Sequence, residues 1–314
     1  MDSLSHALIG IAVAGLSSHQ LSLSDPIYIA TILGAQAPDF DIIASLKGNF
    51  TYIKQHRSFS HSIPGALLWS LLISMGMLFF MPQENGFTLL GWAFAGGLSH
   101  ILIDYCNTHG VAILWPFCRK RKSLNLLNVM DPLLLVLMIV LYLLHLSPLS
   151  LSISTFLIIN AYLLLRFFLQ QRGITYLKTL FPSQQITQLA IMPSLKRIFF
   201  WDFVVETEVC HLVGQLSALN PILEIRAVLP KEKSLSNITL QAKKTPLGDF
   251  FTTFTPFHYF EEHKNEQITS VTIYDLRYIL NKEFLHRGTI VFDGNELPAA
   301  SYMHSYGRTM KVPC

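Results

Sequence analysis

The sequence predicts a mostly α-helical membrane protein: a polytopic transmembrane bundle of four to six spans, followed by a small β-rich soluble domain. Three observations support this fold class. Of the 314 residues, 51% are hydrophobic and 14% are charged, against about 25% charged in an average soluble domain. Long apolar runs fill the first half of the chain. After residue 172 the composition changes, and short β-like runs replace them.

Two uninterrupted apolar runs, residues 62–81 and 87–106, are each close to the ~20 residues that a helix needs to cross a bilayer. The turn at residues 82–86 joins them into a hairpin. A second apolar pair, residues 129–146 and 151–169, is separated by a segment too short for anything except a tight reversal. We therefore expect four spans in this part of the chain.

Two shorter apolar pieces, residues 7–16 and 27–37, precede these runs and are separated by a polar stretch through Asp25-Pro26. They are compatible with two short spans or with a re-entrant hairpin buried against the other helices. The first alternative gives six spans and the second gives four plus a re-entrant pair.

The basic run at residues 119–122 sets the predicted orientation, because Lys and Arg beside span ends favour the cytoplasm. Counting outward from this loop places both termini in the cytoplasm and residues 82–86 outside. The formal net charge of +3 is concentrated in the same loop. The charge therefore reports on topology, and we expect no nucleic-acid partner.

From about residue 199, charged residues are about as frequent as in soluble proteins. Five short runs there have β-like patterns: residues 199–205, 224–228, 249–254, 270–274 and 289–292. We divide the chain into a membrane domain at residues 1–172, a linker at 173–198 and a cytoplasmic β-rich domain at 199–314. The sequence identifies no protein partner for this last domain.

Histidines and aspartates gather where the apolar runs begin or end. Ionisable side chains in or beside hydrocarbon cost roughly 2.5–3.5 kcal/mol each on insertion scales, so they tend to persist where they are paired, metal-bound or functional. The predicted topology places six of them in one cytoplasmic layer. These six are His6, Asp39, His61, His100, Asp104 and Asp131.

His100 and Asp104 are four residues apart, so a helix carries both side chains on one face, where both can bind the same metal ion. The alternative is an aspartate that only orients a buried histidine. Asp2 and His6 repeat the spacing, although Asp2 is equally well explained as a helix cap. Asp131 precedes Pro132 and is typical of an ordinary helix start, and His109 is either a further ligand or part of a loop.

His56 and His61 are five residues apart, which suits one histidine in a loop and the other in the first turn of a helix. Arg57 lies between them, and its planar guanidinium suits an anionic substrate or transition state; the alternative is a topology charge. Asp39 and Asp41 follow Pro38 on a predicted non-helical bend. Carboxylates on such a bend can bridge two metal ions or supply a general base. The alternative is a plain loop that ends the helix.

Imidazole and carboxylate ligands without thiolate suit zinc, manganese or iron, with zinc the default for hydrolysis. The four cysteines show no zinc-site spacing and no compact disulfide framework. More ligands are present than one tetrahedral ion needs. We therefore expect a divalent metal cofactor of one or two ions.

Taken together, four motifs resemble the YdjM-like bacterial inner-membrane proteins, which are described as predicted metal-dependent hydrolases. They lie at residues 1–10, 34–41, 56–62 and 98–104, with Gly110 and Trp115-Pro116 after them, and the resemblance covers residues 1–170. The tail resembles that of longer members with a C-terminal soluble domain. The resemblance implies a bacterial inner-membrane location and a site made of His6, Asp39, His56, His61, His100 and Asp104. A more distant similarity to the zinc-dependent phospholipase C and P1 nuclease group implies phosphodiester cleavage.

The expected function is metal-dependent hydrolysis of a phosphoester, a small molecule or a lipid-derived substrate, at the cytoplasmic leaflet. His6, His61, His100 and Asp104 would hold the metal, Asp39 would bridge or act as base, and Arg57 would stabilise developing negative charge. Membrane lipids are the expected partners. The alternatives are a metal or proton transporter, in which such residues form a relay across the bilayer, and a non-enzymatic membrane scaffold.

Overall fold

The computed structural model describes residues 1–48, 50–51, 53, 57–181, 186–220, 222–231, 234–264, 269–280, 283–305 and 307–314. The chain forms two compact units, Met1–Phe168 and Leu169–Cys314. Helix α7 (Pro148–Leu180) contributes residues to both.

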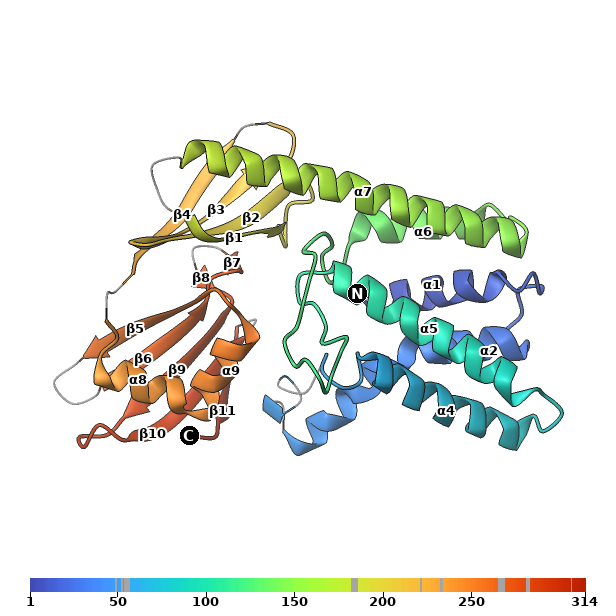
Figure 1. The fold of residues 1–314 in the computed structure, drawn as a ribbon, viewed down its shortest axis with the longest axis horizontal. Helices are drawn as coiled ribbons and strands as arrows, with labels where there is room; N and C mark the ends of the chain where they lie inside the picture. The colour runs from blue at the N-terminus through green and yellow to red at the C-terminus, as the bar shows by residue number, and fades with distance from the viewer. Residues whose placement is uncertain are drawn as a thin grey trace. The chain divides into compact units, whose positions relative to one another are not determined.

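The first unit is a helical bundle. Its helices are α1 (Ser3–Gly15), α2 (Pro26–Gln36), α4 (Ile63–Phe80), α5 (Gly86–Cys106), α6 (Pro132–Leu143) and the first part of α7, with a 3-10 helix, η1 (Ala37–Lys47), directly after α2 (Figure 1). Polar side chains accept hydrogen bonds from the first backbone N–H groups of most of these helices. The capping residues are Asp2, Asp25, Ser62, Asn85 and Asp131.

In the part of the chain that the structure describes, three helices are long and apolar enough to cross a membrane: α4, α5 and α7. Helices α1 and α6 are apolar but shorter. Helix α6 is shorter than the apolar run at 129–146 because Pro132 begins it and the chain leaves the helix after Leu144, at His145 with φ of 49°. The predicted polytopic bundle with a C-terminal β-rich domain is confirmed, although only one helix of the second predicted hairpin has full spanning length.

Helix α5 packs closely against α2 because glycines lie at the crossing. A Cβ atom added at Gly96 would lie 2.1 Å from the carbonyl oxygen of Thr31, and one at Gly34 would lie 2.0 Å from that of Ala93. Small residues let helix backbones approach in this way in membrane proteins. The same helix, α5, carries His100 and Asp104, so this contact also fixes their position relative to α2.

We expect Gly96→Ala to destabilise the bundle by about 1–3 kcal/mol, because the added methyl group meets backbone atoms of α2 that cannot move aside without separating the helices. Gly91→Ala on the same helix is the matched control, since nothing lies within 4 Å of the added atom. Thermal unfolding in detergent measures both variants. Equal unfolding midpoints for Gly96→Ala and Gly91→Ala would show that the close approach does not contribute to stability.

The second unit begins with an antiparallel four-stranded sheet of order β1-β2-β3-β4. Its strands are β1 (Ile186–Pro193), β2 (Phe200–Thr207), β3 (Cys210–Ser217) and β4 (Leu223–Pro230). One face packs on the end of α7, where Leu177 meets Trp201 and Phe203. The opposite face contributes Val204 and Val213 to a second apolar cluster. Because both faces are covered, β2 is buried along almost its whole length.

A five-stranded antiparallel sheet of order β11-β10-β9-β6-β5 follows, with α8 (Asn237–Lys244) and α9 (Pro246–Phe254) beside it (Figure 1). Its strands are β5 (His258–Lys264), β6 (Thr269–Asp275), β9 (His286–Phe292), β10 (Pro298–Ser305) and β11 (Arg308–Val312). The short pair β7 (Ile279–Leu280) and β8 (Glu283–Phe284) lies between β6 and β9 in the chain. Met192, Val204 and Val213 of the first sheet share a core with Phe257 and Tyr278, which joins the two sheets into one unit.

Two segments differ from their predicted structure. The segment expected to be a linker, residues 173–198, contains the last turns of α7 and all of β1. The run at 249–254, expected to be a strand, is the last part of helix α9. Thr245 caps that helix by accepting from the N–H of Gly248, and Pro246 occupies its first turn. These local start signals outweigh the β-like composition of the phenylalanines and threonines that follow.

Candidate metal centre

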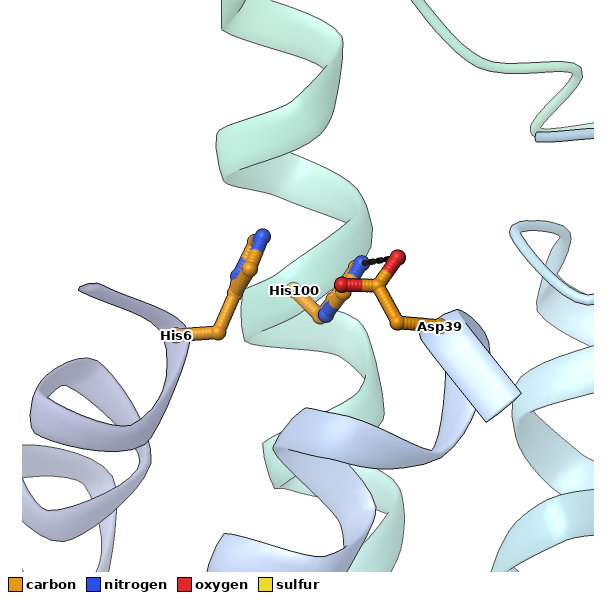
Figure 2. Close-up of side chains that lie close together, drawn as sticks. All are labelled: His6, Asp39 and His100. Carbon is orange, nitrogen blue, oxygen red and sulfur yellow. Dashed lines mark ion pairs between the residues drawn. The ribbon is translucent and has the colours of Figure 1, made fainter. Parts of the chain in front are cut away.

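Five of the six predicted metal ligands lie together at one end of the helical bundle. His6 is in the first turn of α1, His61 precedes the cap of α4, and Asp39 follows α2. His100 and Asp104 occupy the last two turns of α5. The predicted bend that carries Asp39 is instead the 3-10 helix η1. His56, the sixth predicted ligand, lies outside the described residues. Figure 2 shows His6, Asp39 and His100 approaching from three different elements.

The orientation of His100 is fixed by a backbone contact. Its Nδ1 lies 2.7 Å from the carbonyl oxygen of Ala35 in α2. A carbonyl oxygen only accepts hydrogen bonds, so Nδ1 carries the proton and donates it. In the neutral ring the lone pair is then on Nε2, which faces the other members of the cluster. Metal-binding histidines are commonly oriented by such a contact on the opposite nitrogen.

A relay through a hydroxyl group orients His61 in the same way. The Ser60 hydroxyl donates to Asp41 Oδ2 at 2.7 Å, and its oxygen lies 3.0 Å from His61 Nδ1. Because the hydroxyl proton is directed to Asp41, the oxygen accepts from His61 Nδ1–H. Nε2 of the neutral ring is therefore available as a ligand. Asp41 supports the histidine through Ser60, at 3.7 Å from the ring nitrogen itself.

Four side-chain atoms converge on one small volume, and each can offer a lone pair to a metal ion. The imidazole nitrogens Nε2 of His61 and His100 lie 3.2 Å apart. His61 Nε2 is 3.4 Å from Asp39 Oδ1 and 3.6 Å from Asp104 Oδ2. His100 Nε2 is 3.7 Å from each of these two oxygens. Ligand atoms around a tetrahedral ion with bonds of about 2.0–2.1 Å lie about 3.3 Å apart, so His61, His100 and Asp104 would suit three corners of one zinc-sized ion.

The two carboxylates differ in their surroundings. The Asp104 side chain is 1% exposed, and its Oδ2 accepts no hydrogen bond within the described residues, although Arg57 lies near it. The Asp39 side chain is 27% exposed. Burial raises the pKa of Asp39, but the imidazoles of His61 and His100, in their protonated form, hold it below its ordinary range. Asp39 is therefore ionised at neutral pH and forms the open side of the cluster.

His6 faces the other oxygen of Asp104. Its ring stacks on that of His100 with centroids 3.6 Å apart, and its Nε2 lies 3.4 Å from Asp104 Oδ1. The amino group of Met1 lies 2.8 Å from His6 Nε2 and also contacts Asp104 Oδ1. His6 Nδ1 has no hydrogen-bond partner in the described part of the chain. Asp104 thus separates two positions: one beside His61, and one beside His6 where the amino group of Met1 lies.

The predicted catalytic residue Arg57 is buried beside the cluster, with 5% of its surface exposed and a φ of 62°. Its Nη2 lies 3.3 Å from Asp104 Oδ2, and its Nη1 donates to Asn107 Oδ1 at 2.8 Å. Asn107 in turn donates to Asp104 Oδ1 at 2.8 Å. The guanidinium is therefore held at the site through two contacts, and it balances part of the negative charge of the carboxylates.

Three residues that were considered as further ligands have other contacts. Asp2 caps α1 by accepting from the N–H of Ser5 at 3.0 Å. Asp131 caps α6 and accepts from the Tyr162 hydroxyl at 3.1 Å, as its position before Pro132 indicated. His109 lies 3.4 Å from the Thr108 hydroxyl. Among the described residues, the groups with metal-like spacing are His6, Asp39 and His100, and His61, His100 and Asp104.

The supporting residues Ser60, Ala35 and Asn107 were not predicted as parts of the site. Ser60 precedes His61 directly, and Asn107 is three residues after Asp104, where α5 ends. Neither residue indicates a functional site by itself, since Ser and Asn are frequent at helix ends. Ala35 contributes only a carbonyl oxygen, which no side-chain pattern can indicate.

Known protein families match both parts of the chain. The family described as YdjM inner membrane protein matches residues 1–173, and that described as YfhP C-terminal alpha/beta plait domain matches residues 237–311. The uncharacterized protein YfhP of Bacillus subtilis (strain 168) is 30% identical over 288 residues, which cover 88% of this chain and 87% of the relative. No solved structure matches.

Proposed function

This chain belongs to the YdjM inner membrane protein family, and on that premise we propose that it is a membrane-bound metal-dependent hydrolase. Its substrate would be a phosphoester or a lipid-derived molecule at the cytoplasmic leaflet. The observation that supports the proposal most directly is the convergence of three ligand atoms, from His61, His100 and Asp104, at metal-like spacing, which leaves a fourth position for water. Zinc is the proposed metal because imidazole and carboxylate ligands suit it.

The chemistry of the donors supports hydrolysis. A zinc ion held by such ligands lowers the pKa of a bound water molecule to about 7, which supplies a nucleophile at neutral pH. Asp39 lies beside these three ligands and is the most exposed residue of the cluster, so it is placed to accept a proton where substrate and water arrive. Arg57 lies close enough to the cluster to stabilise negative charge that develops on a substrate. His6, which forms the other group of metal-like spacing with Asp39 and His100, would belong to an alternative metal position.

The surroundings of Asp39 favour a substrate with an apolar part. Phe40 and Ile42, on either side of Asp41 in η1, are 45% and 57% exposed. Exposed apolar side chains next to an ionised carboxylate suit a molecule that brings a polar headgroup to the site and keeps its apolar portion at the membrane. We therefore favour a lipid-derived phosphoester over a fully water-soluble one.

Membrane vesicles test the activity and its orientation in one experiment. We expect a charged phosphodiester such as bis(4-nitrophenyl) phosphate to be hydrolysed by inverted vesicles, which expose the cytoplasmic face, and not by sealed right-side-out vesicles. Chelation should abolish the activity, and added zinc should restore it. Vesicles without the protein are the control. Activity only in right-side-out vesicles would overturn the proposed orientation, and metal uptake without hydrolysis of any ester would favour a transporter.

A further inference from the structure

A second site is present in the C-terminal unit, far along the sequence from the metal-binding residues. A pocket of about 330 Å³ opens between the first sheet and the segment around α8 and β5. This volume is at the lower end of the ~300–1,000 Å³ that small-molecule sites occupy. The polar side chains that line it include Glu206, His211, Lys231, Lys243 and His258.

The buried part of the pocket is formed by Glu206 and His211, which pair with each other across β2 and β3. Glu206 already has a cationic partner, because the ammonium group of Lys231 forms an ion pair with it. His211 is 6% exposed, and its Nδ1 has no hydrogen-bond partner within the described residues. A buried polar atom without a partner carries a free-energy penalty that a bound ligand can remove. A ligand that reached this atom would remove the penalty, which makes His211 the most favourable polar contact in the lining.

The charge around the pocket favours an anion. Once Glu206 is neutralised by Lys231, Lys243 is the remaining charged group of the lining, beside the imidazoles of His211 and His258 and the phenol of Tyr259. His258 Nδ1 donates to the carbonyl oxygen of Thr255 at 3.1 Å, which orients its ring. Beside these groups, Leu235, Pro256 and Phe260 supply apolar lining.

We propose that this pocket binds a small organic anion, a phosphate or carboxylate group carried on an apolar body about the size of one ring. His211 and Lys243 contact the anionic group, and the lining near Phe260 contacts the apolar body. This binding site is separate from the metal centre and does not depend on the proposed hydrolysis. It gives the C-terminal unit a ligand-binding role of its own.

Calorimetry on the full-length protein in detergent tests the proposal, with phenyl phosphate and benzoate as the two anionic probes and benzyl alcohol as the neutral one. We expect saturable binding of at least one anion and none of benzyl alcohol; the stronger anion identifies the preferred headgroup. Lys243→Met should weaken binding about tenfold, as loss of one charge-assisted contact does. Lys244→Met, which removes the neighbouring exposed lysine outside the pocket, is the matched control and should leave binding unchanged.

Two further variants test the role of His211 and the independence of this pocket from the metal centre. His211→Phe keeps a ring of similar shape and removes the nitrogen without a partner, so it should also weaken binding about tenfold while the unfolding midpoint stays close to wild type. His100→Ala, at the metal centre, should bind the anions as wild type does. Absence of saturable binding, equal effects of Lys243→Met and Lys244→Met, or loss of binding in His100→Ala would each overturn the proposal.

Discussion

His100→Ala is expected to leave the purified protein without its divalent metal while the helical bundle remains folded. His100 belongs to both groups of residues with metal-like spacing, so its loss removes a ligand from every arrangement that the described residues offer. Mutation of a residue that only orients a metal-binding histidine typically lowers metal affinity by about 10–100-fold. Removal of the ligand itself should exceed this range. Elemental analysis after purification at matched zinc concentration measures the result.

The substitution also removes the hydrogen bond to the carbonyl oxygen of Ala35, so a second variant is needed. His100→Asn places an amide N–H near that carbonyl and still lacks the ligand nitrogen, and it should lose metal as well. His19→Ala is the control, because His19 is an exposed histidine of the same unit. Circular dichroism shows whether the variants are folded. Full metal content in both His100 variants would make this histidine a structural residue.

The arrangement of the bundle could be predicted because membrane insertion imposes strong patterns on the sequence. The apolar runs before and after residues 82–86 became α4 and α5, the longest helices of the first unit apart from α7. The same topology placed His61 at the start of one span and His100 near the end of the next. Two positions that are distant in the sequence could therefore be expected side by side, and their nitrogens lie 3.2 Å apart.

The contacts that orient these ligands could not be predicted, because they depend on how helices pack. The approach of α2 to α5 is decided by Gly34 and Gly96, and only this packing brings the Ala35 carbonyl to His100. The secondary structure of the β-rich unit could likewise be predicted only in part. Thr245 and Pro246 start a helix where the composition after them favoured a strand, and α7 continues beyond the membrane-like part of its sequence.

Arg57→Lys is expected to reduce turnover by about 10²–10³-fold while the metal stays bound. The guanidinium reaches Asp104 and Asn107 at the same time through two nitrogens, and a single ammonium group cannot reproduce this planar arrangement. The positive charge is kept, so the carboxylates of the cluster remain balanced. The proposed ligand atoms come from His61, His100 and Asp104, which is why metal content should not change.

Arg119→Lys is the matched control: Arg119 is an exposed arginine of the basic loop, and the substitution makes the same chemical change outside the proposed site. Turnover of a phosphodiester is measured on both variants in detergent at equal metal loading. Loss of metal from Arg57→Lys would mean that the guanidinium only positions Asp104, and turnover equal to wild type would remove Arg57 from the mechanism. Because a cation transporter needs no contact for an anionic transition state, selective loss of turnover with metal retained is the result that separates a hydrolase from a transporter.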